Sequence, residues 1–188
     1  MTEFTETPLE GVWQITPRRF GDHRGFFSES YNARVFADHG IDTVFVQDNH
    51  SLSQARGTVR GLHFQSPPHA QAKLVRCGRG AIFDVVVDIR AGSATYGQWY
   101  GCELSFDNGR QLLIPAGFLH GFMTLQEDCE IVYKCSDFYA PECDGAVRWD
   151  DPEIGIAWPE VGVPPVLSAK DEAAPLLADF DTPFAAEG

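Results

Sequence analysis

Short runs of apolar residues, separated by turn residues, repeat along most of the chain. The runs are rich in valine, isoleucine and aromatic residues, and several alternate with polar residues at the period of a half-buried strand. Glycine and proline, 18 and 12 in number, are dispersed between the runs and mark turns. The pattern predicts strands over residues 12–15, 43–46, 73–77, 81–89, 98–104, 111–114 and 130–134.

Helical periodicity is confined to one clear segment, residues 33–39, which ends at Gly40. Many short strands with few helices favour a sandwich or a barrel, so we expect a single all-β domain over residues 1–188. From residue 141 onward proline becomes frequent, and we expect residues 141–188 to form a C-terminal arm that packs on the barrel. The last residues, from about 181, are expected to fray.

Composition and charge narrow the classes of function. The 188 residues include 14 Lys and Arg against 27 Asp and Glu, and the net charge of −13 repels nucleic acid and anionic membranes. No stretch approaches the roughly 18 apolar residues of a membrane span. The acidic N-terminus lacks the apolar centre of a secretory signal, and the five cysteines show no C-x-x-C spacing. We therefore expect a cytoplasmic protein with free thiols.

A group of polar side chains interrupts an apolar stretch at residues 56–65. Arg60 and His63 lie in this stretch and Lys73 opens the next predicted strand, so the three can share one sheet. A single histidine in such a place is ordinarily a satisfied core or rim residue. Strict alternation also puts Arg60 and His63 on opposite faces, unless a bulge at Gly61 re-aims one of them.

The pattern Pro115-x-Gly117-x-x-His120 resembles the second sequence motif of the cupin superfamily, whose histidine often binds a metal ion. The first cupin motif needs another histidine two residues after the first, but here Gln65 follows His63 at that spacing. No set of two histidines and one carboxylate follows at the expected spacing. We therefore expect the barrel without a metal site, although a metal held by three distant histidines stays open.

Two predicted strands carry polar groups among apolar neighbours. Alternation over residues 129–135 puts Tyr133 on one face with two cysteines and an isoleucine, which is typical of a barrel interior. Taken alone, Tyr133 would be an ordinary core tyrosine with a hydrogen-bonded hydroxyl. Asp84 shares its face with apolar residues, so we expect it to pair with a histidine or lysine inside the barrel.

Residues 22–25 have the composition of a hairpin turn, and aromatic residues follow them directly. Two interpretations remain open here. Arg24 could grip a phosphate while a phenylalanine stacks on a nucleotide base. Alternatively, the hairpin simply places Phe26 or Phe27 in the hydrophobic core.

Taken together and in order, these segments resemble the dTDP-4-dehydrorhamnose 3,5-epimerase family within the cupin superfamily. The likeness extends from about residue 8 to residue 175 without obvious large gaps. Each piece is a weak signal, whereas the ordered set is specific. The matching segments are residues 24–29 (RGFFSE), 47–51 (QDNHS), 60–65 (RGLHFQ), 115–122 (PAGFLHGF), 133–135 (YKC), 148–152 (RWDDP) and 167–171 (LSAKD).

The resemblance implies a cupin jelly-roll barrel, all-β with a few short helices, that forms a homodimer by exchanging strands and needs no cofactor. It also implies His63 as the general base with Asp171 behind it, although Asp171 taken alone reads as a surface residue. Tyr133 would be the general acid on the opposite side of the sugar. Lys73 would stabilise the enolate oxygen.

The resemblance further implies a site for a dTDP-4-keto-6-deoxyhexose. Arg60 and His120 would contact the diphosphate and the sugar. Arg24, Phe27 and Glu29 would reach the nucleotide of the neighbouring subunit. One departure is Asp144, where the family often has the longer glutamate. The substrate-binding residues implied in this way are Arg24, Phe27, Glu29, Gln47, Asp48, Asn49, Arg60, His120, Asp144 and Lys170.

Proton transfer next to a ketone suits these residue types. Removing the proton puts negative charge on the ketone oxygen, so a cation such as Lys73 must face that oxygen. Histidine ordinarily titrates near pH ~6.5 and therefore works as a base close to neutrality. Because both the substrate and the protein are negatively charged, we expect Arg24, Arg60, Lys73 and Lys170 to converge in a local positive pocket.

The leading hypothesis is an isomerase that epimerises C3 and C5 of dTDP-4-dehydro-6-deoxy-D-glucose to give dTDP-4-dehydro-L-rhamnose, in dTDP-L-rhamnose biosynthesis. One alternative is an epimerase of the same fold that acts at a single carbon in another dTDP-4-keto-deoxysugar pathway. The other two alternatives are a metal-dependent cupin oxygenase and a non-catalytic sugar-binding barrel.

Overall fold

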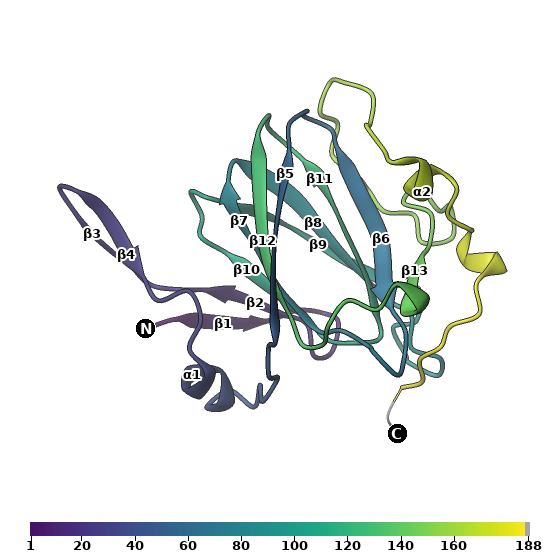
Figure 1. Ribbon diagram of the computed structural model, residues 1–188, viewed down its shortest axis with the longest axis horizontal. Helices are drawn as coiled ribbons and strands as arrows, with labels where there is room; N and C mark the ends of the chain where they lie inside the picture. Colours follow the sequence, from purple (N-terminus) through teal and green to yellow (C-terminus); the bar gives the residue numbers. More distant parts are fainter. Residues whose placement is uncertain (187–188) are drawn as a thin grey trace.

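Two antiparallel β-sheets face each other in the computed structural model, which describes residues 1–186 (Figure 1). This arrangement confirms the predicted all-β class and the jelly-roll barrel. The six-stranded sheet has the order β1 (Glu3–Glu6), β2 (Trp13–Thr16), β10 (Gln111–Ile114), β7 (Lys73–Arg79), β12 (Cys129–Cys135) and β5 (Gln47–Ser53). The five-stranded sheet has the order β13 (Asp144–Ala146), β6 (Val59–Gln65), β11 (Phe118–Thr124), β8 (Ala81–Asp88) and β9 (Trp99–Ser105).

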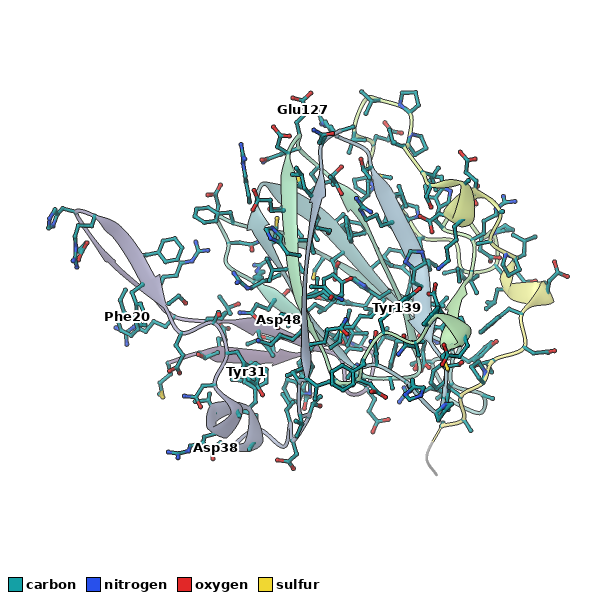
Figure 2. All side chains as sticks on the ribbon, viewed as in Figure 1. Phe20, Tyr31, Asp38, Asp48, Glu127 and Tyr139 are labelled. Carbon is teal, nitrogen blue, oxygen red and sulfur yellow. The ribbon has the colours of Figure 1, made fainter. Side chains whose placement is uncertain are left out.

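The main hydrophobic core lies between the two sheets because alternate residues of each strand point inward. Val75 and Leu112 from the six-stranded sheet pack there against Val86 and Phe122 from the five-stranded sheet. Figure 2 shows side chains filling this space. The predicted interior face of residues 129–135 is confirmed, since both cysteines and the isoleucine are buried and Tyr133 packs against the same core.

The outer faces of both sheets are also covered. Residues 147–184 pack on the five-stranded sheet, where Ile154 and Leu177 contact its buried apolar side chains. Helix α1 (Ala33–Ala37) covers the six-stranded sheet through Phe36. Asn32 caps the helix at its N-terminus. The helix ends at Ala37, and turns continue the chain to Gly40, which was predicted to end the helix. The other helical segments are η1 (Pro141–Cys143), α2 (Ala169–Glu172) and η2 (Leu177–Asp179). Among residues 1–186, no helix has the length and apolar character needed to span a membrane.

A hairpin of β3 (Arg19–Asp22) and β4 (Gly25–Ser28) projects away from the barrel (Figure 1). It confirms the predicted turn at residues 22–25. The expectation that Phe26 or Phe27 enters the core is wrong, because 46% and 71% of their surfaces are exposed. The hairpin pairs with no other strand among residues 1–186, and Phe26 contacts only the guanidinium of Arg19, 4.2 Å from its ring centre, and the ring of Phe106, 5.7 Å away between ring centres.

The predicted strand at residues 43–46 is wrong, and the strand β5 that follows it was not predicted. The sequence of β5, QDNHSLS, contains few residues with an intrinsic preference for strands. It forms because all seven residues pair in register with β12, from Gln47 opposite Cys135 to Ser53 opposite Cys129. The expected fraying from residue 181 is also wrong for the described part, since the amide of Ala91 donates to Phe184 and the hydroxyl of Thr182 donates to Ile89.

Candidate active site

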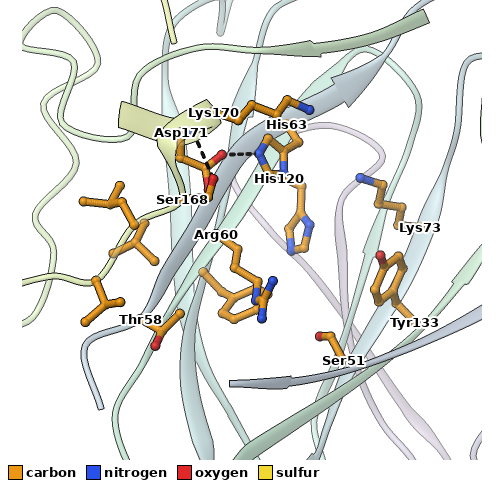
Figure 3. A pocket seen from close by; sticks show the side chains of 14 residues that line it. Ser51, Thr58, Arg60, His63, Lys73, His120, Tyr133, Ser168, Lys170 and Asp171 are labelled. Carbon is orange, nitrogen blue, oxygen red and sulfur yellow. Dashed lines mark hydrogen bonds and ion pairs between the residues drawn. The ribbon is translucent and has the colours of Figure 1, made fainter. Parts of the chain in front are cut away.

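A cavity of about 450 Å³ opens between the two sheets at the end of the barrel that the hydrophobic core leaves free. Strands β6 and β11 contribute His63 and His120 to one wall. Strands β7 and β12 contribute Lys73 and Tyr133 to the wall opposite, as Figure 3 shows. The four residues expected to act on the sugar ring thus share one compartment.

His63 is held by a buried carboxylate. Its Nε2 lies 2.5 Å from Oδ1 of Asp171, which is only 3% exposed in the first turn of α2 (Figure 3). Burial by itself raises the pKa of Asp171, but the hydrogen bond and charge of His63 outweigh it and hold the pKa below its ordinary value. Asp171 therefore stays ionised and fixes the imidazole, which leaves Nδ1 without a protein partner among residues 1–186. The interpretation of Asp171 as a surface residue is wrong.

A bulge in β6 brings Arg60 and His63 to the same cavity. His63 pairs with His120 on β11 and Arg60 pairs with Phe122, so the register shifts between the two pairs. Gly61 lies at the shift with φ of 131°, and a Cβ at this position would meet the Cα of Gly121 at 2.6 Å. The residue must therefore be glycine, and simple alternation does not hold here.

Lys73 and Tyr133 lie close together on the wall opposite the histidines. Lys73 pairs with Cys135 on the neighbouring strand, and Tyr133 stands two residues away on the same face. Burial lowers the pKa of the Lys73 ammonium, with nearby carboxylates acting in the opposite direction. Burial raises the pKa of the Tyr133 phenol, against a smaller effect from Asn49. The tyrosine therefore keeps its proton at a pH where a free phenol would begin to lose it.

His120 is fixed by Asp84, which confirms the predicted pairing inside the barrel. The Nε2 atom of His120 lies 2.8 Å from Oδ1 of Asp84, and the carboxylate is fully buried. The second carboxylate oxygen, Oδ2, has no hydrogen-bond partner among residues 1–186. The imidazole of His120 is thus the only side-chain partner that compensates the burial of Asp84 in this part of the chain.

Arg60 spans the opening between the two sheets. Its Nε donates to the hydroxyl of Ser53 at 3.1 Å, and its Nη2 donates to the carbonyl of Leu52 at 3.1 Å. Both partners belong to β5 at the edge of the opposite sheet. The guanidinium is therefore held over the cavity with donors left over for an anion.

A second compartment of about 440 Å³ continues from the first and shares His63, Lys73, Tyr133 and Lys170 with it. Lys170 forms an ion pair there with Asp144, the position at which the family often has glutamate. The other side chains of this compartment are Gln47, Asn49, Phe64, Gln65, Gln71 and Tyr139. Tyr139 is a site residue that the sequence interpretation missed, and its signal was the aromatic pair Phe138–Tyr139 within a polar loop.

The expected positive pocket forms in part. Arg60, Lys73 and Lys170 line the cavity although the chain as a whole carries a charge of −13. Arg24 does not join them within this chain, because it lies at the tip of the projecting hairpin and pairs with Asp22 at 2.5 Å. Its side chain is 79% exposed.

Phe27, Glu29 and Asp48 also lie outside both compartments of this chain. Phe27 is on the hairpin, and Glu29 accepts a hydrogen bond from Asn32 at 3.0 Å. Asp48 lies on the outer face of β5, because alternation along the strand turns its side chain outward to Lys134 at 2.9 Å.

No group of three or more His, Cys, Asp or Glu side chains within residues 1–186 is placed to hold a metal ion. The two cavity histidines each point one ring nitrogen at a carboxylate instead.

Comparison with known proteins identifies the family. The family model for dTDP-4-dehydrorhamnose 3,5-epimerase matches residues 6–179. The chain belongs to this family. A dTDP-4-dehydrorhamnose 3,5-epimerase of Sinorhizobium fredii (strain NBRC 101917 / NGR234) is 52% identical over 181 residues, which cover 96% of this chain and 92% of the relative. The resemblance noted in the sequence is therefore confirmed, and the protein is an isomerase of the epimerase type.

Solved structures agree with this family assignment and with its cupin-type fold. A Legionella pneumophila Philadelphia 1 epimerase in complex with dTDP-4-keto-L-rhamnose has a TM-score of 0.92 and 46% identity, and the match covers 96% of this chain and 95% of that one. A 3'-monoepimerase of Streptomyces bikiniensis in complex with dTDP-quinovose has a TM-score of 0.86 and 39% identity, over 92% and 86% of the two chains. The fold is thus shared by epimerases with different numbers of target carbons.

Proposed function

We propose that this epimerase inverts C3 and C5 of dTDP-4-dehydro-6-deoxy-D-glucose and so forms dTDP-4-dehydro-L-rhamnose for dTDP-L-rhamnose biosynthesis. One observation carries the proposal. An imidazole and a phenol face each other across one cavity, with an ammonium beside the phenol (Figure 3). A sugar ring between them presents one face to His63 and the other to Tyr133, which is what inversion of a carbon next to a ketone requires.

His63 acts as the base in this proposal. Its imidazole takes the proton from the carbon next to the C4 ketone, and the electron pair moves onto the ketone oxygen as an enolate. Asp171 stabilises the imidazolium that forms, since its carboxylate is 2.5 Å from the ring. Lys73 faces the enolate oxygen in the proposal, and its charge stabilises the anion more than it would in water because the half-buried ammonium is partly desolvated.

Tyr133 acts as the acid. Its hydroxyl gives a proton to the same carbon from the opposite side, the enolate returns to the ketone, and the configuration is inverted. The phenolate and the imidazolium then exchange protons with water, which returns the site to its starting state. The same pair serves C5 after C3, since both carbons neighbour the same ketone.

Substrate binding in the proposal divides between the two compartments. Arg60, His120 and Lys170 lie around the first compartment and contact the diphosphate and the sugar. Asn49 and Tyr139 lie in the second compartment, which takes the nucleoside. Lys170 already reaches the shorter side chain of Asp144. We therefore propose that Asp144 acts by holding Lys170 and not by contacting the substrate.

We also propose a homodimer in which the hairpin of one subunit completes the nucleotide site of the other. The hairpin exposes three phenylalanines and Arg24 to solvent, and exposed apolar groups gathered on a projecting element are typical of a subunit contact. Phe27 and Glu29 would enter the partner's nucleotide compartment together with Arg24. Charge supports this placement, since Arg24 adds a cation to the site of a dianionic substrate.

Mixing two impaired variants tests the exchange. Arg24→Ala should lower kcat/KM about 10- to 100-fold, and His63→Ala should be inactive. Co-expression of the two should restore about a quarter of wild-type activity, since half of a random mixture are hybrid dimers with one complete site each. Co-expression of His63→Ala with Lys73→Ala should restore nothing, because both residues serve the same cavity of one subunit. Absence of recovery in the first mixture would place Arg24 in its own subunit's site.

The alkaline side of the pH profile should report on Lys73. Burial lowers the pKa of Lys73, so its ammonium loses its charge at a lower pH than a free lysine, while burial raises the pKa of Tyr133, whose phenol keeps its proton to a higher pH than a free tyrosine. We expect kcat/KM to begin to fall at a pH below about 10.4, the ordinary pKa of lysine. Lys73→Arg should be slower at neutral pH but should lose this decline, because guanidinium stays charged. Lys134→Arg, on the outer face of the same sheet, should keep the wild-type profile, and an unchanged decline in Lys73→Arg would assign it to another group.

Reaction in D2O, followed by NMR, tests the function itself. dTDP-4-dehydro-6-deoxy-D-glucose should gain deuterium at both C3 and C5 and give the L-rhamno product. Label at one carbon alone would support the single-carbon alternative, which the similarity to a 3'-monoepimerase makes the nearest rival. Full turnover after exhaustive chelation would exclude the metal-dependent oxygenase. No exchange at all would leave only a sugar-binding barrel.

We further propose a cytoplasmic location. All five cysteines are free thiols and four of them are buried. Burial raises the pKa of Cys77 to about 12, so this thiol stays protonated and unreactive. Unpaired thiols in this number are typical of a reducing compartment. Fractionation of cells that express the protein would test the location.

A further inference from the structure

The segment that follows β12 is held by side chains and not by a sheet. Residues 137–140 follow the end of β12, and Tyr139 among them lines the second compartment. Three glutamine side chains, from β5, β6 and the segment before β7, form hydrogen bonds with the backbone N–H and C=O groups of residues 137–140. The bonds run from Gln71 Nε2 to Asp137 O (2.8 Å), from Gln65 Nε2 to Phe138 O (2.9 Å), from Tyr139 N to Gln47 Oε1 (3.1 Å) and from Ala140 N to Gln65 Oε1 (2.9 Å).

Gln65 is the centre of this group. It is only 5% exposed, and a third bond joins its Nε2 to the carbonyl of His69 at 2.5 Å. Both N–H donors of the amide are therefore used, and its oxygen is used as well. A buried amide with all its groups engaged has one favourable orientation, so Gln65 sets the position of the chain around it. It has no donor left for a ligand.

Of residues 137–140 only Ala140 is buried, and the two aromatic rings do not hold the segment in place. Phe138 and Tyr139 are 64% and 60% exposed, so neither ring anchors the chain in a core. Tyr139 instead presents its ring to the second compartment, with its hydroxyl 3.5 Å from Asp144. The position of this aromatic wall thus depends on the glutamine bonds.

We propose that Gln65, assisted by Gln47 and Gln71, is a positioning residue that fixes residues 137–140 so that Tyr139 forms an aromatic wall for the nucleoside of the substrate. The inference rests on the proposed function, because it assumes that the second compartment takes the nucleoside. Gln65 acts through Tyr139 and does not touch the reacting carbons. The same reasoning gives Gln47 a positioning role, since its amide is engaged by Tyr139 and Asn49.

Gln65→Glu tests the proposal with little change in shape. The carboxylate removes both donors and turns an anion toward the carbonyl oxygens of His69 and Phe138. We expect KM and the Kd for dTDP to rise about 10- to 30-fold, while kcat stays within about threefold, because the catalytic pair is untouched. Cleavage by chymotrypsin after Phe138 or Tyr139 should accelerate about tenfold as the segment loosens. Gln98→Glu, at an exposed site on the far side, should change none of these.

A double-mutant cycle separates positioning from a general loss of structure. In a Tyr139→Ala background, Gln65→Glu should raise the Kd for dTDP no further, because the wall it positions is gone. Gln71→Leu removes one outer bond and should shift KM in the same direction by a smaller factor. An undiminished effect of Gln65→Glu in the Tyr139→Ala background, or unchanged chymotrypsin cleavage, would overturn the proposal. Failure of wild-type protein to bind dTDP would instead overturn the proposed function, and the cleavage assay would still decide whether Gln65 holds the segment.

Discussion

His63→Ala is expected to lower kcat by about 10³- to 10⁴-fold and to abolish deuterium exchange at both C3 and C5. The physical reason is that the variant removes the proposed base, while His120, the other imidazole on this wall, is held by Asp84 and contacts the diphosphate and the sugar in the proposal. Asp171 lies behind the imidazole and makes its contact with it, not with the cavity centre. Steady-state kinetics and NMR in D2O would measure the two losses on the same preparation.

Two further variants separate loss of the base from loss of the fold. His63→Ala leaves the buried carboxylate of Asp171 without its partner, so the fold itself is at risk. His63→Gln can place its amide Nε2 where the ring Nε2 donates to Asp171 and removes only the base, so it should be as inactive while keeping a melting temperature close to wild type. His39→Ala, at an exposed position just after α1, should remain fully active. Exchange at wild-type rate in His63→Gln would remove His63 from the mechanism.

Tyr133→Phe is expected to separate proton removal from inversion. The change deletes the hydroxyl alone, so kcat for epimerisation should fall about 10²- to 10³-fold. His63 remains able to remove a proton and return deuterium to the same face. Deuterium should therefore enter the unconverted substrate within about tenfold of the wild-type rate, with configuration retained. One NMR time course reports both quantities.

This second variant makes a contrast with the first, since base removal ends exchange while acid removal leaves it. Tyr96→Phe provides the matched control, because Tyr96 is exposed and lies outside both compartments. Epimerisation by Tyr133→Phe at the wild-type rate would show that water or another group supplies the second proton. Loss of exchange together with epimerisation would show that Tyr133 does more than donate a proton.

The sequence and the structure agree most closely where local pattern decides the outcome. Alternation over residues 129–135 was sufficient to place Tyr133 on the interior face, because a strand with one apolar side has one stable orientation. An apolar face around Asp84 was sufficient to require a partner, and the partner is His120. The ordered motifs were sufficient to name the family, since no single motif is specific but their sequence order is.

Pattern failed where another part of the chain decided the outcome. Strand β5 has little strand preference and exists because β12 offers it a complete set of partners. The same pairing turned Asp48 outward and Asn49 inward, which a motif cannot distinguish. Phe27 lies on a hairpin that projects from the barrel, so its exposure follows from the placement of the hairpin.

The amino-acid sequence by itself determined the all-β class, the family, and the residue types needed to move a proton beside a ketone. Those features depend on local alternation and on side-chain chemistry, which are properties of the chain alone. Only the tertiary structure decided that Arg60 and His63 share a cavity, through a bulge that needs Gly121 close to Gly61. The contact of Asp171 with His63 across 108 positions of sequence was implied by the family resemblance but by no pattern in the residues themselves, and the structure shows it. Contacts between distant segments set both results, and no local pattern contains that information.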